Sequence, residues 1–203
     1  MPKLTFFNIT KDKQEQIINA SLDEFSKFTF NEAKISSIIN KAQIPRSSFY
    51  DYFEDKIDLY KYIFLLIKEE KMKFLSPVFE KPQVDFFETL RELFRAGSAF
   101  AASKPQYEKI ANKVYENIEL VKQILGEENL DVSNSYEFML NKGIEAGEIR
   151  RDIDIKFIAK SIYILSSHLM IEGLKERKIT INELIEEVSD QMVDFIQRGI
   201  TSK

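Results

Sequence analysis

The chain has 203 residues, 44% of them hydrophobic and 31% charged, and this balance excludes an intrinsically disordered protein. It has no cysteine and one histidine, which excludes disulfides, thiolate catalysis and most zinc sites. The net charge of −4 argues against broad affinity for nucleic acid. The first 75 residues are the more basic part, with 12 Lys/Arg against 11 Asp/Glu, whereas the remainder holds 17 against 22.

The start of the chain, MPKLTFFNITKDK, lacks the apolar core and small-residue cleavage pattern of a signal peptide. The longest strongly apolar run, YIFLLI at 62–67, is far shorter than the roughly 20 residues that span a bilayer. We therefore expect a cytoplasmic protein without a membrane anchor.

Apolar residues recur at spacings of three and four along nearly the whole chain, which predicts an all-α fold. Thr10 is a plausible N-cap for the first helix, Pro45 marks the start of a short one, and Asp55 caps a longer linking helix. All six glycines lie at or beyond Gly97, so the earlier turns are built without glycine. The helices predicted in this part are 11–28, 33–41, 45–53 and 56–75.

Two prolines in SPVFEKPQ, at 76–83, indicate a boundary before a larger helical body. Gly126, Gly147 and Gly199 occupy positions typical of helix C-termini. The predicted helices of the body are 83–102, 104–125, 131–146, 154–175 and 181–198, which gives about nine in all. We accordingly expect two domains, a three-helix module at 1–56 and a body at 57–203.

The stretch IPRSSFYDYFEDK, at 44–56, gathers four aromatic residues within the short helix predicted at 45–53. Phe49 and Phe53 share one face of that helix, whereas Arg46, Ser47 and Tyr50 share another. An apolar face and a polar face on the second of two short helices are typical of a helix-turn-helix that reads the major groove. For the tyrosines alone, a half-buried packing role is the alternative.

The N-terminal part resembles the DNA-binding domain of the tetracycline-repressor-like (TetR/AcrR) family of bacterial transcription regulators. The resemblance lies in IINASLDEF (17–25), ISSIINKAQIP (35–45) and above all SSFYDYFEDKIDLY (47–60). It implies that Tyr50 and Tyr52 contact DNA, that Arg46 and Ser47 begin the recognition helix, and that Lys56 clamps a phosphate. The implied DNA-binding residues are Lys34, Ser36, Arg46, Ser47, Ser48, Tyr50, Tyr52 and Lys56.

The chain departs from the family pattern in the turn between the two short helices. Gln43 stands where the family usually has a glycine with positive φ, and Pro45 stands where a serine or threonine often caps. Asp51, Glu54 and Asp55 lie close to the implied DNA surface, where they lower phosphate affinity unless they point away.

The body is expected to supply a dimer interface. The helix at 154–175 is apolar nearly all round and the helix at 181–198 carries a continuous apolar stripe, so both need cover. The resemblance implies that they pair with the same helices of a second copy, so that the homodimer reads a palindromic operator. Burial inside a monomer is the alternative.

The resemblance also implies a cavity for a small, apolar effector in the body. The candidate lining residues are aromatic or polar side chains on the predicted body helices, and plain core packing is the alternative for each of them. They are Phe87, Phe94, Tyr107, Tyr115, Tyr136, Tyr163 and His168.

Together these features predict a sequence-specific DNA-binding regulator, a repressor by analogy with the family, which an effector releases. The rival hypothesis is a helical small-molecule-binding or interaction protein whose DNA binding is weak or lost. We expect no enzymatic activity, because the sequence contains no phosphate-binding glycine loop, no G-x-S-x-G and no H-E-x-x-H. For the same reason no cofactor and no metal is expected.

Overall fold

The computed structural model describes residues 1–80, 85–115, 117–126, 134–176 and 181–201, with their side chains except at 115, 118, 125, 134, 166–176 and 181–185. These residues form eleven helices, and the only β-type pairing among them is an isolated bridge between Ile149 and Thr201. The predicted all-α fold is confirmed.

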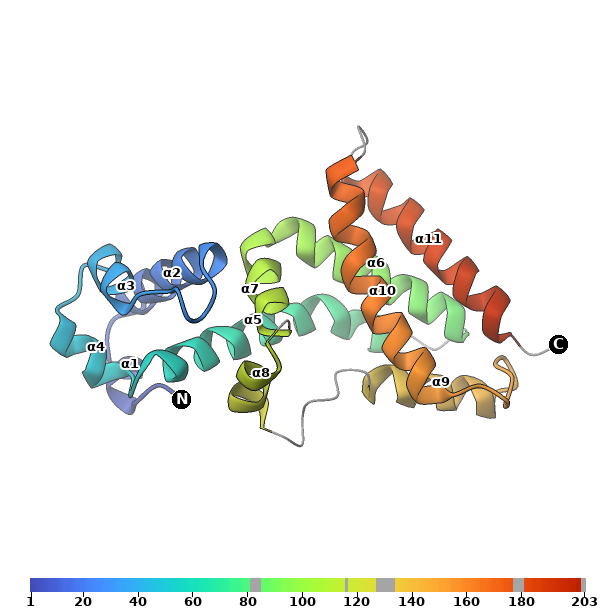
Figure 1. Cartoon of the computed structure of the whole chain (residues 1–203), viewed down its shortest axis with the longest axis horizontal. Coiled ribbons are helices and arrows are strands. Elements are labelled where there is room, and N and C mark those ends of the chain that lie inside the picture. Colours follow the sequence, from blue (N-terminus) through green and yellow to red (C-terminus); the bar gives the residue numbers. More distant parts are fainter. Residues whose placement is uncertain (81–84, 116, 127–133, 177–180, 202–203) are drawn as a thin grey trace. The chain divides into compact units, whose positions relative to one another are not determined.

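The chain divides into two compact units, which Figure 1 colours along the sequence. Unit 1 comprises Met1–Glu70 and Lys104–Leu130, and unit 2 comprises Lys71–Ser103 and Asp131–Lys203. Unit 1 contains α1 (Leu4–Asn8), α2 (Lys11–Lys27), α3 (Ile35–Lys41), α4 (Arg46–Tyr52), the first part of α5 (Lys56–Glu80), α7 (Pro105–Tyr115) and α8 (Ile118–Leu125). Unit 2 contains the end of α5 together with α6 (Phe86–Ser103), α9 (Asn134–Glu145), α10 (Ile155–Glu176) and α11 (Ile181–Ile200).

The core of unit 1 is rich in aromatic rings. Phe25 of α2 meets Tyr60 of α5 with ring centroids 4.5 Å apart, and Phe49 of α4 meets Phe53 at 5.6 Å. All four side chains are fully buried, as are Ile17 and Ile38 of α2 and α3. Large rings bury much apolar surface per residue, so a few short helices can share one core.

Charged side chains join α2 to its neighbours. The amine of Lys113, on α7, donates to the carbonyl oxygens of Phe25, Ser26 and Phe28 at 3.3, 2.9 and 3.2 Å, and so closes the C-terminal end of α2. At the same end, hydrogen bonds from Lys41 of α3 and from Lys27 hold the pKa of Asp23 below its ordinary value. A lysine near these orphan carbonyl groups also opposes the negative end of the helix dipole.

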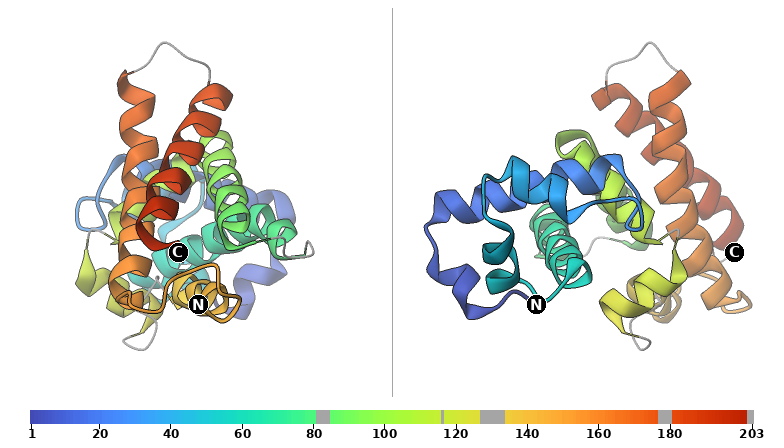
Figure 2. Two further views of the ribbon diagram at one scale, coloured as in Figure 1. Left: turned by 90° about the vertical axis from the view of Figure 1, so that its right-hand side faces the viewer. Right: turned by 60° about the vertical axis from the view of Figure 1, so that its left-hand side comes forward.

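Unit 2 is a bundle in which α6, α9 and α10 pack with α11 around an apolar core. Figure 2 shows α10 and α11 side by side, with α6 next to α11. The core includes fully buried Leu90, Leu140 and Val193 from α6, α9 and α11. At its rim Arg91 Nε of α6 lies 2.9 Å from Asp190 Oδ1 of α11.

Most helices lie where the sequence predicts them, but the structure differs in four places. The five-residue α1 was not predicted, and Gly199 lies within α11 rather than beyond its end. The linking helix continues through Pro77 to Glu80, since Val78 in its last turn is buried in the core of unit 2. The region 104–125 forms two helices, because Asn117 caps a new one by accepting a hydrogen bond from Leu120 N at 3.1 Å.

Candidate nucleic-acid interface

A tight turn joins α3 to α4. The N–H of Ile44 donates to Ile39 O at 3.0 Å and the N–H of Gln43 donates to Asn40 O at 3.2 Å, which is the hydrogen-bond pattern of a Schellman motif. Gln43 has a φ of 50°, the left-handed conformation that glycine normally supplies. The turn that the sequence predicts is therefore present without its usual glycine.

Two further contacts support this turn. Ile44 and Ile39, the two residues that the 3.0 Å hydrogen bond joins, are both buried. The amine of Lys13, on α2, donates to the carbonyl oxygens of Ala42 and Gln43 at 3.3 and 3.2 Å. The strained residue is thus held in place from both sides.

The recognition helix α4 has the two faces that the sequence predicts. Phe49 and Phe53 are fully buried and fix the helix to the core of unit 1. Arg46 and Ser47 are exposed, and Tyr50 is 41% exposed, so these three side chains form one open polar face. A cation, a hydroxyl and a phenol on one helical face can donate to and accept from base edges and phosphates.

Ser48 and Tyr52 lie on the flank of α4 rather than on its open face. Both are half-buried, and the ring of Tyr52 packs edge-on against Phe6 of α1, with centroids 6.1 Å apart. For Tyr52 the structure therefore combines the two sequence interpretations, since part of the ring packs and part remains exposed.

Lys34 and Ser36 stand at the start of α3, and both are exposed. Lys34 occupies the N-cap position, where its N–H donates to the buried Glu24 Oε1 of α2 at 2.8 Å. This contact fixes the first turn of α3 while the lysine side chain extends outward.

Lys56, the expected phosphate clamp, has protein partners at the start of α5. Its amine donates to the carbonyl oxygens of Phe30, Asn31 and Ala33 at 2.6, 3.4 and 2.9 Å. It also lies 4.6 Å from the centre of the Phe30 ring. In this conformation the amine ties the loop between α2 and α3 to α5.

The acidic residues after α4 are partly neutralised or occupied. Glu54 Oε2 lies 3.1 Å from the amine of Lys3, and Asp55 Oδ1 accepts the N–H of Asp58 at 2.8 Å, which confirms Asp55 as the cap of α5. Asp51 is exposed on the same arc of α4 as Ser47. Asp51 therefore lies beside the open polar face of α4.

The described effector candidates are divided between the two units. Phe87 and Phe94 are buried in the core of unit 2, and Tyr136 packs against the same cluster. Tyr163 is half-buried on α10. Tyr107 belongs to unit 1, where the amine of Lys104 lies 4.9 Å from its ring centre. The side chains of Tyr115 and His168 lie outside the described residues.

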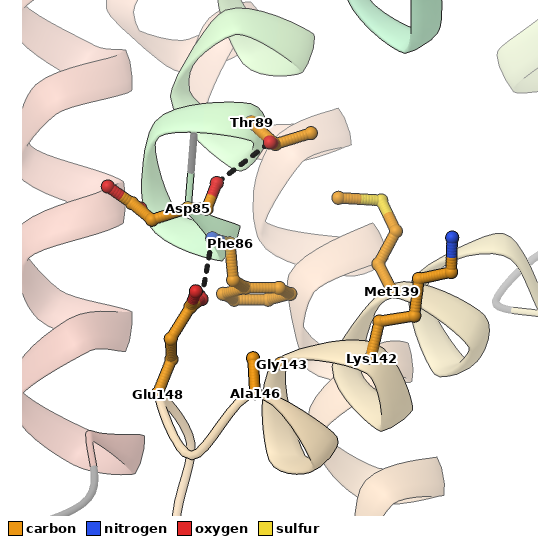
Figure 3. A pocket seen from close by; sticks show the side chains of 8 residues that line it. All are labelled: Asp85, Phe86, Thr89, Met139, Lys142, Gly143, Ala146 and Glu148. Carbon is orange, nitrogen blue, oxygen red and sulfur yellow. Dashed lines mark hydrogen bonds between the residues drawn. The ribbon is translucent and has the colours of Figure 1, made fainter. Parts of the chain in front are cut away.

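A cavity of about 200 Å³ opens in unit 2 between the start of α6 and the end of α9, and none of the described effector candidates lines it (Figure 3). Its floor carries the Phe86 ring, and Glu148 Oε2 accepts the Phe86 N–H at 2.7 Å. Gly143 packs closely there, since a Cβ would stand 2.6 Å from Ile149 Cδ1 and the end of that side chain would have to shift. The lining residues are Asp85, Phe86, Thr89, Met139, Lys142, Gly143, Ala146 and Glu148.

Helix α1 contributes to the site in a way that the sequence did not predict. Lys3 and Thr5 hydrogen-bond to the backbone of α4, and Phe6 packs beneath it. The pair Phe6-Phe7 in an otherwise polar start was the available signal. Among the described residues, no cluster of histidine, aspartate or glutamate is arranged to hold a metal ion, and no helix has the length and apolarity to cross a membrane.

No protein-family model matches the sequence. An uncharacterised HTH-type transcriptional regulator, YdgC of Bacillus subtilis strain 168, is 22% identical over 186 residues, covering 81% of this chain and 85% of that protein. The crystal structure of a TetR family transcriptional regulator from Chloroflexus aurantiacus J-10-FL is 26% identical, with a TM-score of 0.79 over 100% of both chains. The regulator FadR from Bacillus subtilis, solved with stearoyl-CoA, is 19% identical, with a TM-score of 0.71 over 88% of this chain and 97% of its own.

The likeness to FadR shows a shared fold. The other two proteins are also similar in sequence, and both are transcriptional regulators. The helix-turn-helix with its open polar face is the element that such regulators direct at DNA. Fold, motif and relatives together show that this chain is similar to transcriptional regulators of the TetR type.

Proposed function

We propose that the protein is a dimeric, sequence-specific repressor that inserts α4 into the major groove of a palindromic operator and leaves it when a small molecule binds in the body. The open face formed by Arg46, Ser47 and Tyr50, on a helix anchored by Phe49 and Phe53, carries the proposal. A rigid polar helix face of this kind suits base readout.

In this proposal Arg46 donates to a guanine edge, while Ser47 and Tyr50 contact a base or a phosphate. Ser48 and Tyr52, on the flank, reach the sugar-phosphate backbone. Lys34 and Ser36 contact phosphates at the edge of the groove from the start of α3. Lys56 joins them only by exchanging a loop carbonyl for a phosphate oxygen, because its amine donates to three carbonyl groups.

The proposed homodimer forms through α10 and α11. Exposed apolar side chains on these helices support this choice, with Phe157 and Ile164 on α10 and Phe195, 70% exposed, on α11. Large apolar groups facing water on adjacent helices are typical of an interface. Two-fold symmetry then spaces the two α4 helices about 34–36 Å apart, or one turn of DNA.

The proposed effector is small and mostly apolar, and unit 2 binds it. Phe87, Phe94, Tyr136 and Tyr163 remain the candidate contacts, and the cavity beside Phe86 is a second place to test. Compounds that carry a long apolar chain are the first to screen, since the structural neighbour FadR was solved with stearoyl-CoA. The same proposal assigns DNA binding to 1–56 and effector binding and dimerisation to 57–203, and it places the protein in the cytoplasm with its DNA.

The test is fluorescence anisotropy with DNA from upstream of the protein's own gene, at two salt concentrations and with scrambled DNA as competitor. We expect selective binding of two protomers per site with a steep salt dependence. Tyr50→Ala should weaken selective binding by about 1–3 kcal/mol without altering the fold. If the upstream DNA shows no selectivity, the same assay on DNA selected from random sequences decides whether an operator exists elsewhere.

The rival function is a helical ligand-binding protein with weak DNA affinity. Asp51 on the exposed arc of α4 and the engaged amine of Lys56 favour it, because both reduce attraction to phosphate. Absence of selective binding in both DNA tests, together with binding of an apolar ligand, would establish the rival instead.

A further inference from the structure

The last four carbonyl groups of α4 are all occupied, although a helix end normally leaves them without helical partners. The helix itself supplies one donor, since Phe53 N donates to Phe49 O at 2.9 Å. The other three donors come from the N-terminal arm, which we define as residues 1–8 and which contains α1.

The arm contributes both backbone and side-chain donors to this cap. Lys3 N donates to Tyr52 O at 2.8 Å, and the amine of Lys3 donates to Tyr50 O at 2.9 Å. The hydroxyl of Thr5 donates to Asp51 O. Three consecutive carbonyl groups of the recognition helix therefore depend on one segment more than 40 residues away in sequence.

Apolar packing holds the arm in place beneath the helix. Phe6 is fully buried, and its ring centroid lies 5.1 Å from that of Phe53 and 5.4 Å from that of Tyr62 on α5. The amine of Lys3 also pairs with Glu54 at 3.1 Å, which places a positive charge beside a carboxylate near the DNA surface.

The recognition helix has little other means of remaining ordered. It has seven residues, and its N-cap, Pro45, offers no side-chain hydrogen bond. Isolated helices this short are unstable in water, because nucleation costs more than a few hydrogen bonds return. The order of α4 must therefore come from Phe49 and Phe53 below it and from the arm at its C-terminal end.

We propose that the N-terminal arm is a positioning element for DNA recognition, in which Lys3 and Thr5 hold the last turn of α4 in the conformation that presents Tyr50. Neither residue needs to touch a base. Because the arm keeps α4 ordered before DNA binds, binding loses less conformational entropy, and such preorganisation increases affinity. The consequence for DNA rests on the proposed function, whereas the bracing of α4 does not.

The first part of the test measures amide hydrogen exchange in the peptide 46–53 of the full-length protein. Thr5→Val removes the donor from an exposed side chain, and Thr5→Ser keeps it. Lys3→Met removes the amine, and Lys3→Arg keeps a charged donor. We expect Thr5→Val and Lys3→Met to speed exchange in this peptide by about three- to ten-fold, as the loss of one hydrogen bond predicts, while Thr5→Ser and Lys3→Arg stay near wild type.

The second part compares affinity for the operator with affinity for scrambled DNA. Thr5→Val leaves the net charge unchanged, so it should weaken operator binding by about three- to ten-fold and leave scrambled binding as it was. Lys11→Met, which removes a charge from the start of α2, is the control for the charge lost in Lys3→Met. Lys3→Met should lower the operator-to-scrambled ratio, whereas Lys11→Met should lower both affinities alike.

Unchanged exchange in 46–53 for both Thr5→Val and Lys3→Met would overturn the proposal, whatever the DNA results. Faster exchange with an unchanged affinity ratio would also overturn it, since the arm would then stabilise α4 without serving recognition. A wild-type protein with no selective binding to any DNA would instead refute the proposed function, and the exchange result would still decide whether the arm braces the helix.

Discussion

The amine of Lys56 lies 2.6 Å from the carbonyl oxygen of Phe30 and 4.6 Å from the centre of the same residue's ring. One side chain of α5 thus holds both the backbone and the ring of a residue in the loop between α2 and α3. The family resemblance implies that this lysine contacts a phosphate. The geometry adds a structural role, so one amine would have to serve both the loop and the DNA.

Replacing Lys56 separates these roles. We expect Lys56→Ala to lower the free energy of unfolding by about 1–3 kcal/mol, because it removes charge-assisted hydrogen bonds to three loop carbonyl groups. Urea titration measures this loss. We also expect Lys56→Ala to change the salt slope of DNA binding less than Lys34→Ala does, because the side chain of Lys34 is exposed. A drop of about one unit in the slope for Lys56→Ala would instead show that Lys56 contacts a phosphate.

Gln43 offers a substitution that should stabilise the protein. Its backbone φ of 50° is more strained for a residue with a side chain than for glycine. Gln43→Gly should therefore raise the free energy of unfolding by about 0.5–1 kcal/mol. Gln43→Ala is the control, because it shortens the side chain but keeps the strain. Equal midpoints for both variants in thermal unfolding would show that the turn carries no such strain.

Tyr60 gives a pH-dependent prediction. It is fully buried, its hydroxyl has no hydrogen-bond partner among the described residues, and burial raises its pKa to about 12. An unfolded tyrosine titrates near pH 10, so between about pH 10 and 12 the folded state keeps a proton that the unfolded state loses. The stability linked to Tyr60 is therefore complete below pH 10 and declines above it by up to about 1.4 kcal/mol per pH unit.

Tyr60→Phe tests this linkage. At pH 8 the variant should be as stable as the wild type or more stable by about 1 kcal/mol, since it removes a buried hydroxyl without a partner. Urea titrations at pH 8 and pH 11 should show a larger advantage at pH 11. Tyr62→Phe, at a half-buried position, should show a smaller gain in stability at pH 11. If the stability advantage of Tyr60→Phe shrinks as the pH rises, the proposed linkage is wrong.

The proposed dimer interface can be tested at Phe195 of α11. Phe195→Glu should convert the dimer to monomer and reduce operator affinity, because it places a charge in an apolar interface. Sedimentation velocity measures the change in mass. Phe138→Glu on α9 is the matched control, since Phe138 is 62% exposed but lies outside α10 and α11. Monomer formation by both variants, or by neither, would place the interface elsewhere.

Local patterns in the sequence predicted much of the fold. The spacing of Phe49 and Phe53 predicted which face of α4 is buried, and Asp55 marked the start of α5. Both signals act over a few residues along the chain, where periodicity and capping are decisive. The positive φ of Gln43 was implied by the family resemblance rather than by a local pattern.

The features that the sequence did not reveal depend on contacts distant in the chain. Five residues are too few for a readable period, and α1 is stabilised by Phe6 packing on residues more than 40 positions away. The continuation of α5 through Pro77 depends on burial of Val78 in unit 2. The carbonyl partners of Lys56 lie more than 20 residues earlier, so no local pattern indicates them.

In unit 1, lysine amines donate hydrogen bonds to backbone carbonyl groups at turns and helix ends, positions where glycine is common in helical proteins. Lys13 serves the turn after α3, Lys56 the loop after α2 and Lys113 the end of α2 itself. Chemical treatments aimed at surface lysines are therefore not neutral for this protein. Reductive methylation, used to improve crystals, leaves a dimethylated amine with one N–H instead of three, so it would remove donors from all three loop closures and should be avoided before any DNA-binding assay.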